Sequence, residues 1–230
     1  MSVVIEETIK IKPFDSASVS HIVTEDDEPV DNMFSAKQQR LMVESIYSSK
    51  PIRWPFLADA NVGVFRSPYL PPLVPDVFLS LDVEVHENWY AKEHRSYFLW
   101  EFGKPPDVVV EIVSNKKGGE AGKKVRVYAQ MGVWYYVIYD PQQLIQDEFL
   151  RVYKLRAGRY VLKSDWWLDS VGLGVTLWEG EFEGVWEQWL RWCDQDGNVI
   201  STGAELAKWQ RERAERLAAQ LRVLGIEPEV

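Results

Sequence analysis

The sequence predicts an α/β fold whose core follows the order helix, three strands, helix and strand. Two observations carry this prediction. The aliphatic run at 108–113 (VVVEIV) is typical of a strand that is buried on both faces. A segment of helical length at 120–131 separates it from a second apolar run at 133–139 (VWYYVIY). A strand, a helix and a strand in this order form a right-handed βαβ unit.

The elements before this unit are predicted from a cap, a proline-rich link and an alternating pattern. Ser35 is a suitable N-cap for a helix over 36–48, whose apolar residues share one face. The next predicted strand is short and covers 61–65 (NVGVF), after a link that contains two prolines. Residues 77–85 alternate between apolar and polar side chains from position 79, which predicts a strand with one buried and one polar face.

The chain after residue 140 is predicted to add β-hairpins and then a helix. Residues 151–164 form the first hairpin, with its turn at Ala157-Gly158, and two further β-like segments follow. Near the C-terminus an a/d pattern with intervals of three and four is formed by Ala207, Gln210, Ala214, Leu217, Leu221 and Leu224, of which all but Gln210 are apolar. This spacing favours a helix that packs on its own chain or on a partner protomer, with a frayed tail as the alternative.

Charge is unevenly distributed along the chain. The 230 residues carry 26 basic and 35 acidic side chains, a net charge of −9, which argues against a protein coated in nucleic acid. The excess of acid lies in 1–32 and 164–198, whereas 104–126 is locally basic. Because counterion release needs only a local basic surface, DNA is still a permitted partner. We divide the chain into an acidic lead-in (1–32), a main domain (33–200) and a helical tail (201–230).

Composition excludes several classes of protein and site. The single cysteine, Cys193, cannot build a disulfide framework or a zinc site of four cysteines. The three histidines are scattered, which argues against a histidine-rich metal centre. The N-terminus does not resemble a signal peptide, and no stretch approaches the ~18 consecutive apolar residues of a membrane span. We therefore expect a soluble, cytoplasmic protein with no membrane partner.

Two acidic residues occupy positions where a charge would be buried. Glu111 interrupts the aliphatic run, and Asp76 opens a strand directly after Pro75. Buried carboxylates are almost always paired or bound to a cation. Lys124 follows on the helix that packs back over the strand of Glu111. Two carboxylates and a lysine suit a hard divalent cation such as Mg2+ (or Mn2+), which would polarise a phosphate and activate its bound water.

The same segments resemble a known family. LVPDVFLSL, followed by PPDVVVEIVSNKKGGEAGKKVRVYAQMGVWYYVIYDP, is similar to the Uma family of bacterial restriction endonucleases, which in turn resembles the PD-(D/E)xK nuclease superfamily. The shared motifs are a PD at a strand start, a PD followed by E and S, a Lys four residues before a Tyr, and GV-x-x-Y-x-x-x-DP. The resemblance implies a restriction-endonuclease-like αβββαβ core with a mixed central sheet, and metal-dependent hydrolysis of DNA phosphodiester bonds.

The resemblance also implies roles for individual residues. Asp76 and Glu111 would be metal ligands, and the backbone carbonyl of Ile112 would be a third. In the standard pattern the catalytic lysine follows the glutamate by two residues, but Val113 occupies that position here. The family supplies the amine from the next helix instead, where Lys124 aligns. Asp76, Glu111 and Lys124 are therefore the expected catalytic residues.

Four further residues are weaker candidates. Lys123 is adjacent to the predicted lysine but points about 100° around the helix. Asp107 shares a strand face with Glu111 but lies about 13 Å from it, which favours a structural role at the strand start. The first helix of the family often presents a polar residue to the site, and Glu44 and Gln38 are the local candidates.

Alternatives to a nuclease stay open at this point. Glu111 has a structural interpretation as a paired core acid, and Asp76 has one as a turn cap. In a second functional hypothesis the nuclease fold lacks catalysis and serves as a binding or oligomerising module, which the acidic composition favours. In a third, the tryptophan-rich C-terminal half and the tail are purely structural. We expect a homo-oligomer, most simply a dimer.

Overall fold

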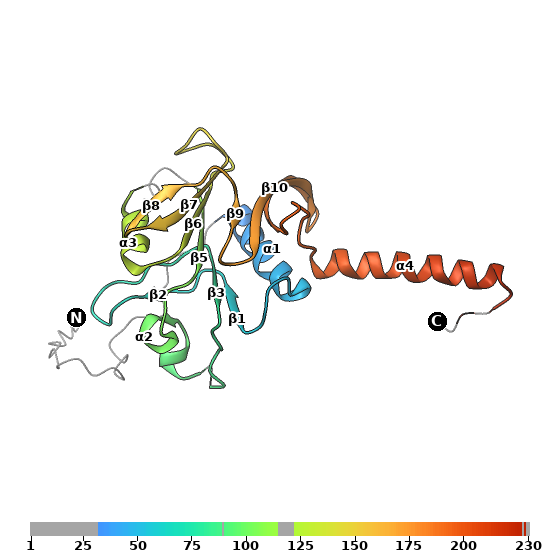
Figure 1. Cartoon of the computed structure of the whole chain (residues 1–230), viewed down its shortest axis with the longest axis horizontal. Coiled ribbons are helices and arrows are strands. Elements are labelled where there is room, and N and C mark those ends of the chain that lie inside the picture. Colours follow the sequence, from blue (N-terminus) through green and yellow to red (C-terminus); the bar gives the residue numbers. More distant parts are fainter. Residues whose placement is uncertain (1–31, 89, 115–121, 227, 229–230) are drawn as a thin grey trace, which may run out of the picture.

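The computed structural model describes residues 32–88, 90–114, 122–226 and 228. A six-stranded mixed sheet forms its centre, with a three-stranded antiparallel sheet and a helix toward the C-terminus (Figure 1). The predicted α/β class and its C-terminal additions are confirmed. Except for its last residue, the predicted acidic lead-in lies outside the described residues, as does the start of the predicted helix at 120–131.

The central sheet contains the predicted βαβ unit. Its strands are, in spatial order, β1 (Phe56–Asp59), β3 (Val77–Leu81), β5 (Val108–Ile112), β6 (Tyr135–Tyr139), β7 (Leu150–Arg156) and β8 (Arg159–Leu162). β5 and β6 are parallel, and every other neighbouring pair in this sheet is antiparallel. The connection between the parallel strands is α3 (Lys123–Met131), which ends at Gly132 in a left-handed conformation. Glycine adopts this conformation at little cost.

Both faces of the central sheet are buried. Alternate residues of a strand point to opposite faces, and Val110 packs in one apolar cluster with Ile46 of α1 (Met33–Ser49). Val109 belongs to the cluster on the other face, together with Tyr128 of α3. The sheet is therefore the middle layer, and its central strands are apolar on both sides, as the run at 108–113 predicted.

The predicted hairpin at 151–164 forms β7 and β8 of the central sheet, and the strands after it form a second sheet that packs on the α1 side. It consists of β9 (Trp167–Leu168), β10 (Leu173–Phe182) and β11 (Val185–Cys193), in the order β11-β10-β9. Trp192 is buried in the same cluster as α1, and its indole N–H donates to the Met42 carbonyl at 3.0 Å. Gln38 of α1 makes a reciprocal pair with the β11 backbone. Its Nε2 donates to the Leu190 carbonyl at 2.7 Å, and its Oε1 accepts from the Leu190 N–H at 2.9 Å.

The first strand of the core lies in a different place from the one predicted. The segment 61–65 contributes only the two-residue β2 (Val64–Phe65), which pairs with β4 (Tyr97–Phe98) in a separate small sheet. The core strand is β1, four residues directly after Pro55. Three of these four residues are buried, so β1 shows no alternation that the sequence could reveal.

The strand predicted over 77–85 is shorter and more buried than its pattern indicates. β3 ends at Leu81 because Asp82 has a φ of 55°, outside the extended region. Ser80, predicted on a polar face, is buried and shares a hydrogen bond of 2.8 Å with the Tyr97 hydroxyl. The sheet is covered on both sides, so this face tolerates a serine only where a partner satisfies it.

The remaining described helices are short, apart from the last one. η1 (Lys92–His94) and α2 (Leu99–Phe102) flank β4. α4 (Gly203–Val223) confirms the predicted C-terminal helix and projects away from the rest of the molecule (Figure 1). Among the described residues, no helix combines the length and the apolar character needed to cross a membrane.

The Gln38–Leu190 pair predicts a measurable loss of stability. In Gln38→Ala, the buried N–H and C=O of Leu190 lose their partner, which we expect to lower the free energy of unfolding by about 2–4 kcal/mol. Urea denaturation measures this change. The control is Lys37→Ala, which removes an exposed ion pair with Glu183 and should cost less than about 1 kcal/mol. Equal losses in the two variants would contradict a structural role for the Gln38 amide.

Candidate functional site

The structure brings Asp76 and Glu111 to neighbouring positions on two strands. β3 and β5 run antiparallel with Val77 opposite Val110. The next position in this register places Asp76, which precedes Val77, opposite Glu111, which follows Val110. The Glu111 side chain leaves the sheet on the face covered by α3, because Val110 points to the α1 face. Asp76 lies directly before β3, and its carboxylate is reached from α1 and from β5.

The Glu111 carboxylate is fully buried and is compensated by α3. Lys124 donates from Nζ to Glu111 Oε2 at 2.7 Å, and the Tyr128 hydroxyl donates to Oε1 at 2.9 Å. The two donors are four residues apart, so they lie on one face of the helix. An uncompensated charge at this depth would be strongly destabilising, so the ion pair and the hydrogen bond are conditions for placing Glu111 here.

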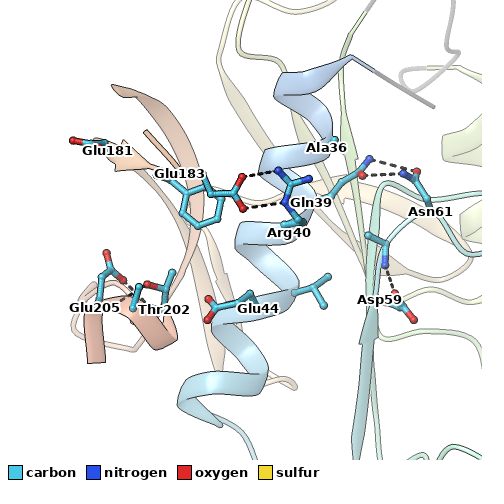
Figure 2. A pocket seen from close by; sticks show the side chains of 14 residues that line it. Ala36, Gln39, Arg40, Glu44, Asp59, Asn61, Glu181, Glu183, Thr202 and Glu205 are labelled. Carbon is cyan, nitrogen blue, oxygen red and sulfur yellow. Dashed lines mark hydrogen bonds and ion pairs between the residues drawn. The ribbon is translucent and has the colours of Figure 1, made fainter. Parts of the chain in front are cut away.

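The Asp76 carboxylate is held from two other elements. It is buried, with 7% of its surface exposed. Its Oδ2 accepts from the Ile112 N–H at 2.6 Å, and its Oδ1 accepts from Gln39 Nε2 of α1 at 2.8 Å. Asn61 donates to Gln39 Oε1 at 2.8 Å, which turns the NH2 of Gln39 toward Asp76. The Gln39–Asn61 pair is visible in Figure 2.

The carbonyl of Ile112, the predicted third ligand, faces the side of Asp76. The Val113 N–H donates to the Tyr139 carbonyl of β6 at 2.8 Å. In a planar trans peptide the C=O and the N–H point in opposite directions. The Ile112 carbonyl therefore points away from β6, toward the side where its own N–H meets Asp76.

Tyr128 is fixed as a hydrogen-bond donor. Burial, and then the negative charge of Glu111, raise the pKa of the Tyr128 hydroxyl well above its usual range. The phenol therefore keeps its proton at any physiological pH. It can orient the Glu111 carboxylate, but it is unsuited to act as a base.

The donor set fits Mg2+ better than a metal that needs a complete protein cage. Among the described residues, no three His, Cys, Asp or Glu side chains come together as a ligand group. Mg2+ is commonly bound by one or two carboxylates, with water and substrate phosphates in the other positions. A carboxylate offers about four acceptor positions, so a carboxylate that accepts hydrogen bonds can also coordinate a cation.

The structure does not bring the weaker candidates to this site. Lys123 is exposed at the start of α3. Asp107 lies at the opposite end of β5, where Lys104 Nζ donates to its carboxylate at 2.6 Å. Glu44 accepts from the Gly203 N–H at 2.7 Å and thus holds α4, and Gln38 holds β11.

Sequence reasoning missed three residues of the site, Gln39, Asn61 and Tyr128. Gln38 and Gln39 are consecutive on α1, and nothing in the sequence shows which of them faces β3. The Asn61 side chain acts on Asp76 through Gln39, from a loop distant in sequence. Tyr128 had a signal, because a tyrosine four residues after Lys124 must share its helix face.

A cavity of about 780 Å3 adjoins the site but is unsuited to a phosphate chain. Gln39 and Asn61 line it on one side, and Figure 2 shows them across from the β10–β11 turn. Its acidic side chains are Glu44, Asp59, Glu181, Glu183 and Glu205, against a single arginine, Arg40, that pairs with Glu183. Such a lining repels polyanions.

The chain is similar to one protein family and to a solved structure. A family model described as "Uma2: Putative restriction endonuclease" matches residues 35–174. One similar solved structure is described as "a putative nuclease belonging to DUF820" from Anabaena variabilis. It is 18% identical over 60% of this chain and 71% of that chain, with a TM-score of 0.41. None of the curated proteins matches this chain.

The buried pair of Lys124 and Glu111 predicts an energetic coupling that a double-mutant cycle can measure. Lys124→Met removes the cationic partner and should lower the free energy of unfolding by about 1–3 kcal/mol in metal-free buffer. Adding Glu111→Gln should recover part of the loss, because the charge that needed the partner is gone. Chemical denaturation measures Lys124→Met, Glu111→Gln and the double variant, which complete the cycle. Lys123→Met is the exposed control and should stay within about 0.5 kcal/mol of the unmodified protein. Additive losses would refute the coupling.

Proposed function

The chain belongs to the Uma2 family, described as "Putative restriction endonuclease", and on this premise we propose that it is a metal-dependent endonuclease that hydrolyses DNA phosphodiester bonds. One observation carries the proposal. The fully buried Glu111 is paired with a lysine from α3, beside a second carboxylate at the adjacent strand position. A core that needed only stability would place an apolar residue there, since buried ion pairs add little net stability.

In the proposed site, Asp76, Glu111 and the Ile112 carbonyl hold Mg2+ (or Mn2+). When bound, such a cation polarises a phosphate and lowers the pKa of a coordinated water. Gln39 and Tyr128 touch neither cation nor substrate in this scheme. They hold the two carboxylates in one orientation through the hydrogen bonds described above.

Lys124 is the group that we propose positions the attacking water. Its Nζ lies 2.7 Å from the Glu111 carboxylate, and its side chain is 24% exposed, so the ammonium borders both the buried carboxylate and solvent. From there it can donate to a water that approaches the phosphorus, or offset charge on a phosphate oxygen.

Support for DNA comes from the surface next to the site. Lys123 and Arg126 are exposed on α3, the helix that carries Lys124. Phosphate contacts of this kind need few basic residues and weaken as salt rises. With a net charge of −9 on the whole chain, engagement should be confined to this face and be strongly salt-sensitive.

A catalytically inactive binding module is the second candidate. The observation that favours it is the internal pairing of both carboxylates, which satisfies them without a cation. In this case the fold and the network persist, and metal binding is absent. The two candidates therefore differ in a directly measurable property.

Cleavage assays test the enzyme. We expect plasmid and linear duplex DNA to be cut in Mg2+ or Mn2+ at low salt, and Asp76→Asn and Glu111→Gln to abolish cutting. Lys124→Met should lower the rate by about 10²–10³-fold, the usual contribution of one donor that stabilises developing charge. Lys123→Met should leave the rate of the chemical step unchanged. Cutting by Glu111→Gln at the unmodified rate would refute the assignment.

Calorimetry with Mn2+ separates the two candidates. We expect one ion to bind per chain, with binding lost in Asp76→Asn and retained in Asp107→Asn, whose carboxylate lies at the far end of β5. Absence of binding to the folded, unmodified protein would favour the inactive module. Near-ultraviolet circular dichroism of each variant checks that the fold is intact.

A further inference from the structure

The base of α4 is fixed to the body of the protein. Thr202 and Glu205 form a capping box, in which the Glu205 N–H donates to Thr202 Oγ1 at 3.2 Å and the Thr202 N–H donates to Glu205 Oε2 at 2.7 Å. Arg191 of β11, only 1% exposed, pairs with Glu205 at 2.7 Å. Glu44 of α1 accepts from the Gly203 N–H (Figure 2 shows Glu44, Thr202 and Glu205 at this base). These contacts fix the direction in which α4 leaves the body.

Beyond this base, α4 carries a stripe that is apolar except at Gln210. It consists of Ala207, Gln210, Ala214, Leu217, Leu221 and Leu224. The helix has 21 residues, a length of about 31 Å at 1.5 Å per residue, and Figure 1 shows it standing clear of the sheets. No residue of α4 is buried, Leu217 is 50% exposed, and Leu224, which caps the helix, is 73% exposed. In proteins, most of the stability of a helix comes from packing its apolar face against another element. A rigidly anchored helix with an uncovered stripe therefore needs a partner.

We propose that α4 pairs with α4 of a second copy of this chain, in antiparallel orientation. In antiparallel coiled coils a positions pack against d positions. One register uses all six stripe residues. Ala214 then lies opposite Leu217 of the second copy, Gln210 opposite its Leu221, and Ala207 opposite its Leu224. Every layer matches one leucine with a smaller side chain, so the distance between the helices stays constant and side chains interdigitate.

A parallel pairing packs less evenly. In parallel register each stripe residue meets its own copy. The layers at Ala207 and Ala214 would then be narrow, and those at Leu217, Leu221 and Leu224 wide. One interhelical distance cannot fill both kinds of layer, so parallel pairing leaves gaps in the first half of the helix.

Charge is compatible with the antiparallel register. Arg211 and Arg213 flank the stripe in the first half of α4. In the antiparallel register Arg211 lies opposite Ala218 of the second copy, and Arg213 lies opposite its Gln220. Like charges therefore do not meet across the seam. The Arg213 guanidinium lies over the Trp209 ring, at 5.5 Å from its centre, beside the stripe. The antiparallel arrangement also holds the two acidic bodies at opposite ends of the helix pair, which reduces their mutual repulsion.

The number of residues in the seam, the contact between the two copies of α4, determines how strongly the copies bind each other. Stripe and flanking positions amount to roughly twelve residues per chain, below the 20–30 residues per partner of a standard interface. We therefore expect a reversible dimer that forms at micromolar protein concentration. This inference does not depend on the proposed nuclease activity, because none of its residues belongs to the site around Asp76 and Glu111.

Sedimentation equilibrium of the full chain tests the pairing. We expect the mass to rise from monomer to dimer across micromolar concentrations. Leu217→Glu, at the centre of the seam, should stay monomeric throughout. Ala219→Glu adds the same charge on the opposite face of α4 and should dimerise as the unmodified protein does. Circular dichroism confirms folding of both. A monomeric unmodified chain, or a dimeric Leu217→Glu, would overturn the proposal.

Disulfide cross-linking tests the orientation. Ala207→Cys and Leu224→Cys are prepared as separate proteins and mixed under mild oxidation. Antiparallel pairing brings these two positions together, whereas identical positions lie about 26 Å apart at 1.5 Å per residue, too far for a disulfide. We expect the mixed product only. Self-linked Leu224→Cys dimers would instead show a parallel pair. The native Cys193 is buried and does not compete.

Discussion

The burial of two carboxylates at adjacent strand positions is the constraint on which the rest of the structure depends. Glu111 and Asp76 stand in a sheet that is covered on both faces, where each charge must be met by donors or by a cation. The fold supplies these donors from separate elements: an ammonium and a phenol from α3, an amide from α1, and a backbone N–H from β5. The relative placement of β3, β5, α1 and α3 is therefore tied to the compensation of these charges.

α1 links the two halves of the molecule through consecutive side chains. Gln38 closes both backbone groups of Leu190 in the C-terminal sheet, and Gln39 holds Asp76 in the central sheet. The matched family region ends within β10, so most of the C-terminal hairpin lies outside it. Yet that hairpin packs on the helix that carries Gln39. Loosening of the C-terminal sheet would consequently disturb the orientation of a carboxylate that it never contacts.

Local signals account for what could be predicted from the sequence. The βαβ unit was predictable because its strands are long apolar runs and its helix ends at a glycine, and the pairing of Lys124 with Glu111 follows from that unit. β1 was missed because it is four residues long and buried on both faces. Gln39 and Asn61 were missed because their role depends on contacts between segments distant in sequence. Periodicity carries no information on such contacts.

The hydrogen bond from the Ile112 N–H to Asp76 has a consequence for spectroscopy. At this position the chain gives its amide proton to a carboxylate, at 2.6 Å, where a regular ladder would offer a carbonyl. The electron density around that proton therefore depends on the ionisation of a single side chain. In a nitrogen–proton correlation spectrum, the Ile112 resonance would move as Asp76 gains a proton or meets a cation. One backbone signal can thus monitor the carboxylate without a reporter group attached to the side chain.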